Sequence, residues 1–180
     1  MAQKKHPYLW LAQAGVIAAM YTALTMILPA ASFGPIQVRL SEALTILPVF
    51  SPVAVPGLTV GCLLANMLGL ATGANPIGAW DLLLGPTATL LAALLTRLWR
   101  NKKAAGLPIL SCLPPIFFNA VIIGAELSFA YYDFSLPTLG FCMGTVGLGQ
   151  LIACLGGGLI LYLALDRSGA AAVLFRHTEP

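Results

Sequence analysis

Two ionisable residues lie close together at the start of an apolar run, in a sequence that otherwise avoids charge. Arg39 and Glu42 occur in the stretch GPIQVRLSEALTILP, residues 34–48. Because they are three residues apart, both can lie on one face of a helix. One interpretation is a mutual salt bridge, which contributes little stability when exposed. The interpretation that we favour is a binding site, in which the arginine orients a carboxylate that offers two acceptors to a ligand.

A second polar pair occurs in the stretch FFNAVIIGAE. Glu126 follows Asn119 by seven residues, which is about two helical turns, so both side chains project from the same helix face. Such groups need polar partners or a water-filled cavity, because exposure to lipid costs several kcal/mol. We expect this face to meet a ligand, and a structural bond between helices is the alternative.

Single polar residues interrupt other apolar runs. Asn66 in LLANMLG and Gln150 in GLGQLIA either bridge helices or contribute to the same site. Asp81 has three possible roles, which are contact with lipid headgroups, capping of a helix start, and ligand binding. Asp133 lies near a predicted loop boundary, where contact with lipid headgroups is one interpretation and a role in the site is the other.

The composition shows which elements must position these groups. The chain has 180 residues, of which 59% are hydrophobic and 8% charged, and its mean hydropathy is +0.91. Soluble domains carry about 25% charged residues. We therefore predict an all-α integral membrane protein with one domain over residues 1–180. The basic residues form short clusters at span ends, which makes nucleic acid an unexpected partner.

Pro, Gly and charged residues divide the apolar sequence into six segments of approximately transmembrane length. These are residues 8–30, 36–51, 55–72, 80–97, 107–129 and 138–165. The second is short and charged, and a re-entrant segment is its alternative. If all six cross, every basic cluster falls on one side, and basic loops stay cytoplasmic. We therefore predict that both termini are cytoplasmic and that Arg39 lies outside. The other basic residues are expected on the cytoplasmic side, and they are Lys4, Lys5, Arg97, Arg100, Lys102, Lys103, Arg167 and Arg176.

Small residues recur in the first and last segments. Ala14 and Ala18, and beside them Gly15, Ala19 and Ala23, are spaced by four residues and predict a smooth stripe for close helix approach. Glycines in the last segment predict close packing within the bundle. Prolines 86, 114 and 115 are expected to bend the fourth and fifth helices. The four cysteines lie in apolar runs without ligand spacing, so we expect buried thiols and no metal site.

Three runs of this sequence resemble a known protein family. The runs FGPIQVRLSEALTILPVFSPVAVPGL, GCLLANMLG and WDLLLGPTATLLAALLT are similar to the QueT family, substrate-binding S-components of energy-coupling factor (ECF) transporters. The resemblance implies a six-helix bundle in the prokaryotic cell membrane that binds a queuosine precursor, queuine or a related deazaguanine, from outside. It also implies docking through the first helix, at Ala14, Ala18, Ala19 and Ala23, to a T-component that carries two ATPase subunits.

A deazaguanine presents adjacent N–H donors beside a carbonyl acceptor. Under this resemblance, Glu42 or Glu126 would take the donor pair, and Asn66, Asn119 or Gln150 would meet the carbonyl. Aromatic residues near the outer ends would stack on the rings or form the interfacial belt. These aromatic residues are Phe33, Trp80, Phe129, Tyr131 and Tyr132. A cationic aminomethyl group on the ligand would suit Asp81.

Other functions remain as alternatives. The sequence has no GxxxxGK[ST] phosphate loop, so ATP is expected to act on partner subunits, with no cofactor in this chain. An intramembrane enzyme is disfavoured, because both histidines are terminal and no nucleophile–base pair is recognisable. An S-component for a different vitamin or nucleobase, or a gradient-driven carrier for a small solute, stays open.

Overall fold

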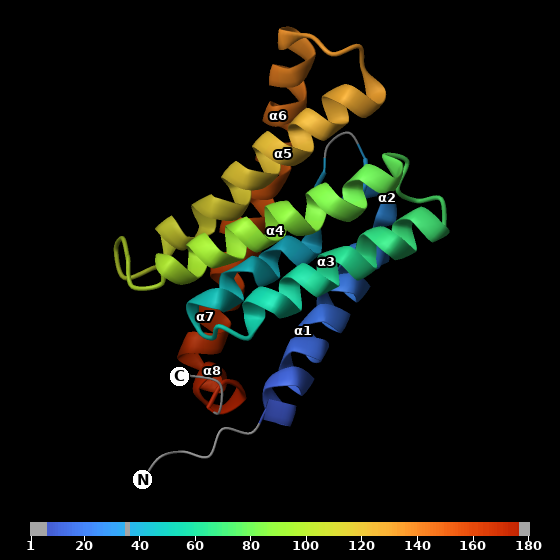
Figure 1. The fold of residues 1–180 in the computed structure, drawn as a ribbon. Helices are drawn as coiled ribbons and strands as arrows, with labels where there is room; N and C mark the ends of the chain where they lie inside the picture. Colours follow the sequence, from blue (N-terminus) through green and yellow to red (C-terminus); the bar gives the residue numbers. More distant parts are fainter. Residues whose placement is uncertain (1–6, 35–36, 177–180) are drawn as a thin grey trace.

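The computed structural model describes residues 7–34 and 37–176, and these residues form a bundle of helices (Figure 1). Within that part of the chain the β-structure consists of an isolated bridge between Ala104 and Leu107. The all-α prediction is therefore confirmed. Lys4, Lys5 and the first residue of the predicted second segment lie outside the described residues.

The long helices match most of the predicted segments within a few residues. They are α1 (Pro7–Ile27), α3 (Ala54–Ala71), α4 (Asp81–Leu98), α5 (Leu113–Tyr131) and α6 (Leu136–Leu151), and α6 continues through the π-helix η4 (Ile152–Gly158) into α7 (Leu159–Arg167). Short elements are α2 (Pro29–Ser32), α8 (Ala170–Leu174) and the 3-10 helices η1 (Leu40–Val49), η2 (Gly78–Trp80) and η3 (Ile109–Cys112).

Five helical segments are long and apolar enough to cross a membrane. They are Tyr8–Ile27, Ala54–Ala71, Gly78–Leu98, Ile109–Tyr131 and Leu136–Arg167. The chain is therefore a multi-pass membrane protein by length and composition. The predicted second segment is the exception, because it forms the ten-residue 3-10 helix η1 instead of a full-length α-helix.

The helix η1 lies at the centre of the bundle. It contacts α1, α3, α4, α7 and η4, and seven of its ten residues are buried. At its start, Arg39 bonds to Asp81, the first residue of α4. At its end, the carbonyl groups of Pro48 and Val49 accept hydrogen bonds from Arg97, near the end of α4. The segment therefore runs parallel to α4 along most of its length.

Local sequence explains where two of the later helices begin. Ser135 and Thr138 form a reciprocal capping box at the start of α6, which satisfies backbone N–H groups that would otherwise lack partners. Pro114 and Pro115 fall in the first turn of α5. The prediction that these two prolines bend the fifth helix is wrong, because a proline in the first turn removes no helical hydrogen bond.

Glycines in the last helical segment allow it to pack closely against η1 and the residues just before it. A Cβ atom at Gly149 would collide with the backbone oxygen of Gln37, and one at Gly157 would lie 2.9 Å from the Cβ of Ala43. These two positions confirm close packing by the last segment. Gly140, Gly144 and Gly156 have open space instead.

The small residues of α1 serve two different faces. Ala14 and Ala18 are buried against α3, at Gly57 and Gly61, whereas Ala19 and Ala23 are exposed. The prediction of one docking stripe therefore needs correction. Ala14 and Ala18 already have a partner within the bundle, because α1 and α3 approach closely at the two glycines.

The contact between α1 and α3 predicts an asymmetric effect of two similar substitutions. A Cβ at Gly61 would lie 2.7 Å from the Cβ of Tyr21 and 2.9 Å from the backbone oxygen of Ala18. We expect Gly61→Ala to destabilise the protein by about 1–3 kcal/mol through overpacking. Gly15→Ala, where nothing lies within 4 Å, is the matched control. Thermal unfolding in detergent measures both, and equal midpoints would contradict the packing.

Candidate binding site

A buried ion pair joins the segment before η1 to the start of α4. The Arg39 Nη2 atom lies 3.3 Å from the Asp81 Oδ2 atom, and the side chains are 3% and 0% exposed. Arg39 also donates from Nε to the backbone oxygen of Ser32 at 2.8 Å. Its guanidinium carbon lies 5.0 Å from the ring centroid of Phe33. The arginine is thus held by a carboxylate, a carbonyl and an aromatic face.

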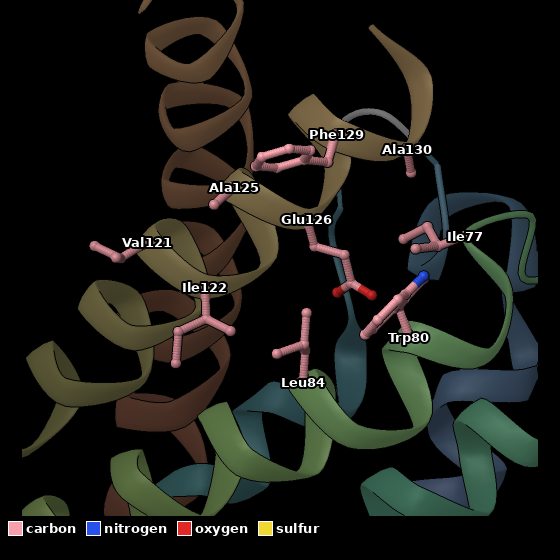
Figure 2. A pocket seen from close by; sticks show the side chains of 9 residues that line it. All are labelled: Ile77, Trp80, Leu84, Val121, Ile122, Ala125, Glu126, Phe129 and Ala130. Carbon is pink, nitrogen blue, oxygen red and sulfur yellow. The ribbon is translucent and has the colours of Figure 1, made fainter. Parts of the chain in front are cut away.

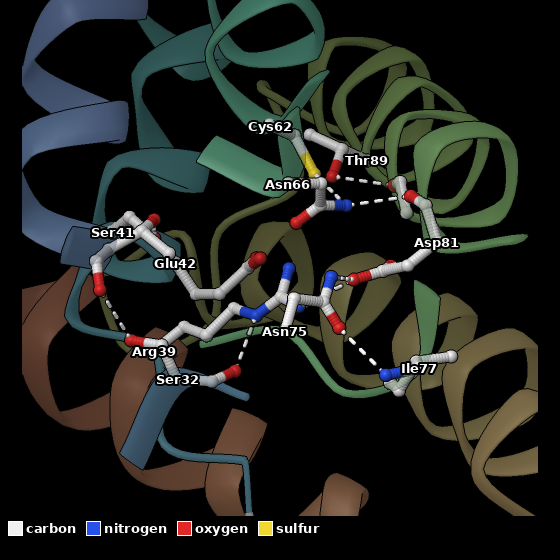
Figure 3. Close-up of polar contacts among 12 residues, drawn as sticks. Ser32, Arg39, Ser41, Glu42, Cys62, Asn66, Asn75, Ile77, Asp81 and Thr89 are labelled. Carbon is white, nitrogen blue, oxygen red and sulfur yellow. Dashed lines mark hydrogen bonds and ion pairs between the residues drawn. The ribbon is translucent and has the colours of Figure 1, made fainter. Parts of the chain in front are cut away.

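Two asparagines complete the surroundings of Asp81 (Figure 3). Asn75 donates from Nδ2 to Asp81 Oδ2 at 2.6 Å, and Asn66 donates to the backbone oxygen of Asp81 at 2.7 Å. Asp81 is therefore neither a headgroup contact nor the cap of α4, since it is buried and makes no capping bond. Burial of a carboxylate requires such charge and hydrogen-bond partners.

Glu42 belongs to a different set of contacts. Its Oε1 accepts a 2.5 Å hydrogen bond from the hydroxyl of Tyr21, and its Oε2 accepts one from Asn119 Nδ2 at 3.4 Å. The interpretation of Arg39 and Glu42 as a mutual salt bridge is wrong, because the ion pair of Arg39 is with Asp81. Glu42 instead links η1 to α1 and α5.

Glu126 is the acid that faces a cavity (Figure 2). The cavity has a volume of about 690 Å³ and lies between α4 and α5. Its walls are apolar apart from the Glu126 carboxylate and the indole of Trp80, and they comprise Ile77, Trp80, Leu84, Val121, Ile122, Ala125, Glu126, Phe129 and Ala130. Glu126 is 6% exposed, and neither carboxylate oxygen has a hydrogen-bond partner among the described residues.

The nine predicted site residues therefore divide into groups. Trp80 and Glu126 line the cavity, whereas Arg39, Glu42, Asn66, Asp81 and Asn119 belong to buried polar contacts. Gln150 is buried, and its Oε1 lies 3.5 Å from the Cys154 sulfur. Tyr131 is exposed and lies outside the cavity lining. All four cysteines are free and buried, as predicted.

Several residues in these contacts were missed by sequence reasoning. Tyr21 gave one usable signal, because a phenol within an apolar helix needs a hydrogen-bond partner when it is buried. Asn75 lies in the sequence GANP and has the pattern of a turn residue, so its bond to Asp81 had no local signal. The apolar residues of the cavity also gave no signal in the sequence, since the same residue types face lipid and face a cavity.

No cluster of three or more His, Cys, Asp or Glu side chains within the described ranges has the geometry to hold a metal ion. The arrangement is suited to binding a small molecule with hydrogen-bond donors. The cavity volume falls within the range of about 300–1,000 Å³ for small-molecule sites. One acceptor-only carboxylate, bordered by apolar walls, would fix the orientation of such a molecule.

The ion pair predicts a strong effect when one partner is removed. Arg39→Met leaves Asp81 buried without its cation, which costs about 3–5 kcal/mol. We expect the double variant Arg39→Met with Asp81→Leu to recover much of this loss, because no buried charge remains. The control Asp133→Asn changes an exposed acid and should alter stability by at most about 0.5 kcal/mol. Thermal unfolding of purified protein measures all three, and an Arg39→Met midpoint equal to the control's would refute the role of the pair.

Comparisons with known proteins identify the family of this chain. The chain is 35% identical over 79 residues to the queuosine precursor transporter QueT of Lactococcus lactis subsp. cremoris strain MG1363. That match spans 42% of this chain and 42% of the relative. No solved structure matches the chain. The family model described as QueT transporter matches residues 11–167, which include the cavity and every long helix except the first four residues of α1. The chain therefore belongs to the QueT transporter family, whose members are transporters and not enzymes.

Proposed function

We propose that this protein is the S-component of an ECF-type importer in the prokaryotic cell membrane. It binds a queuosine precursor, queuine or a related deazaguanine, at the extracellular side and delivers it by docking to a T-component with two ATPase subunits. The observation that carries the proposal is the family match over residues 11–167. The name of the Lactococcus relative supports the substrate class, and the cavity beside Glu126 supplies a compartment of suitable size and chemistry.

The substrate assignment is tested by direct binding to the purified protein. We expect a deazaguanine to bind and unrelated vitamins such as riboflavin or biotin to show no saturable binding. Isothermal titration calorimetry with such a panel measures this. Saturable binding of a vitamin with no binding of any deazaguanine would replace the substrate class while leaving a transport role intact. Uptake by the chain alone, in cells that lack ECF ATPase subunits, would identify a gradient-driven carrier instead.

The membrane topology is part of the same proposal. We propose six crossings with both termini in the cytoplasm, and with η1 as the short second crossing. A 3-10 helix rises about 2 Å per residue, so ten residues extend about 20 Å, and extended flanking residues add about 3 Å each. Contacts support a crossing by η1, since its two ends bond to opposite ends of α4.

Two exposed positions distinguish this topology from one in which η1 re-enters. Pro76 precedes α4, and Asn101 lies in the basic loop after it. In intact cells, we expect a membrane-impermeant thiol reagent to label Pro76→Cys and to leave Asn101→Cys unlabelled. Both variants should react once the cells are broken, and the native cysteines are buried. With the N-terminus in the cytoplasm, the reverse labelling pattern in intact cells would show that η1 does not cross.

The proposed docking surface is the outward face of α1. Gly15, Ala19 and Ala23 share a helical face by their four-residue spacing, and no atom lies within 4 Å of a Cβ placed at Gly15. An apolar groove of about 440 Å³ continues this face between α1 and α3. Its lining residues are Ala19, Thr22, Ala23, Met26, Leu64, Met67 and Leu68. Small residues allow another membrane helix to approach closely.

Bulky side chains on this surface should prevent assembly without disturbing the bundle. We expect Ala19→Leu with Ala23→Leu to reduce co-purification with the T-component and ATPase subunits at least about tenfold, equivalent to ~1.4 kcal/mol. Binding of the deazaguanine by the isolated protein should be unchanged. Gly140→Leu, at an exposed position of α6 with open space around it, controls for added apolar bulk. Normal recovery of the complex by the double variant would exclude this face as the docking surface.

A further inference from the structure

We propose that Glu126 is the specificity-determining residue of the α4–α5 cavity, and that its carboxylate accepts the two adjacent N–H donors on one edge of a 2-amino-4-oxo heterocycle. These donors are the ring N–H and the exocyclic amine. This inference rests on the proposed function, because it takes a deazaguanine as the substrate class. It assigns Glu126 to one edge of the ligand. The exocyclic amine is then the group by which Glu126 distinguishes this ligand from similar bases.

The hydrogen bonds of the buried acids select Glu126. The buried acids among the described residues are Glu42, Asp81 and Glu126. Both oxygens of Glu42 accept hydrogen bonds, from Tyr21 and Asn119. Asp81 is paired with Arg39 and accepts from Asn75, both through Oδ2, whereas its Oδ1 has no hydrogen-bond partner among the described residues. Within that part of the chain, Glu126 has no partner at either oxygen and no cation beside it, and a buried carboxylate that is left without hydrogen bonds is costly.

The position of Glu126 directs it toward a ligand instead of a neighbouring helix. The residue lies on α5, and its carboxylate points into the cavity toward Trp80 from η2 (Figure 2). Phe129, one turn further along α5, forms another part of the wall. The cavity thus places one hydrogen-bonding group among apolar and aromatic surfaces. A flat heterocycle fits this combination, because its edge can bond to the acid while its face contacts the aromatic side chains.

The chemistry of the carboxylate defines which edge it can receive. An ionised carboxylate has two oxygens that only accept hydrogen bonds, and it binds parallel donors well. The ring N–H and the exocyclic amine of a 2-amino-4-oxo ring provide two donors side by side. Replacement of the amine by hydrogen removes one of them and leaves one oxygen of Glu126 without a partner. Such a loss at a buried charged acceptor weakens binding by about 10-fold to 150-fold.

A competing assignment would pair Glu126 with a positive charge on the ligand. An aminomethyl substituent carries such a charge, whereas a cyano substituent does not. If the charge were recognised, a neutral base would gain nothing from Glu126. The two assignments therefore differ in what they predict for neutral ligands.

The decisive experiment measures the affinity of four probes for three forms of the full-length protein in detergent. The probes are 7-deazaguanine, 7-deazahypoxanthine, 7-cyano-7-deazaguanine and 7-aminomethyl-7-deazaguanine, and the proteins are wild type, Glu126→Gln and the control Asp133→Asn. We expect wild type and Asp133→Asn to bind 7-deazaguanine at least about tenfold more tightly than 7-deazahypoxanthine. In Glu126→Gln this preference should fall to about threefold or less, and affinity for the neutral cyano base should fall about tenfold or more, because an amide offers one acceptor and a competing donor.

The possible outcomes separate the inference from the proposed function. If wild type binds none of the four bases, the proposed substrate class fails. If wild type binds them but does not distinguish 7-deazaguanine from 7-deazahypoxanthine, the role of Glu126 is overturned and the substrate class stands. The same conclusion follows if Glu126→Gln loses only the preference for the aminomethyl base over the cyano base. The comparison of ligands on wild type needs no variant, so an absent preference overturns the role of Glu126 even if Glu126→Gln does not fold.

Discussion

The structure depends on the satisfaction of polar groups inside an apolar bundle. Water is scarce there, so a charged side chain must find its hydrogen-bond partners within the protein. Arg39 and Asp81 meet this requirement together, with Ser32 and Asn75 supplying further bonds. The pair connects the segment that precedes η1 to the first turn of α4. It therefore fixes where the central helix begins relative to the rest of the bundle.

The central position of η1 follows from the same constraint and from small residues around it. Its polar side chains bond to other helices, as Glu42 does to Tyr21 and Asn119. Gly149 lets the last helical segment approach the backbone of Gln37, just before η1, and Gly157 lets it approach Ala43 within η1. The helix η1 has a buried carboxylate and lies in the middle of a membrane protein. It therefore needs hydrogen-bond partners for its polar groups and space for its backbone.

Glu126 differs from the other buried acids because its neighbours are apolar. The polar contacts of Glu42 and Asp81 hold helices together, whereas the Glu126 carboxylate borders a cavity of about 690 Å³ between α4 and α5. This separation supports a structural role for Glu42 and Asp81 and the proposed ligand-binding role for Glu126. The proposed recognition site lies away from the exposed face of α1, so the proposed binding and docking surfaces are different parts of the bundle.

The sequence by itself determined the class of protein and the positions of the long helices, because length and hydropathy are local properties that a lipid environment imposes on each segment. It also identified Arg39, Asp81 and Glu126 as unusual, since a charge in an apolar run is visible without a structure. Only the tertiary structure decided that Arg39 pairs with Asp81 instead of Glu42, that Ala14 and Ala18 face α3, and that η1 is a short 3-10 helix. Each of these outcomes depends on which side chains, far apart in the chain, come within about 3–4 Å of one another. Helix packing sets those distances, and the spacing of residues along the sequence does not indicate how the helices pack.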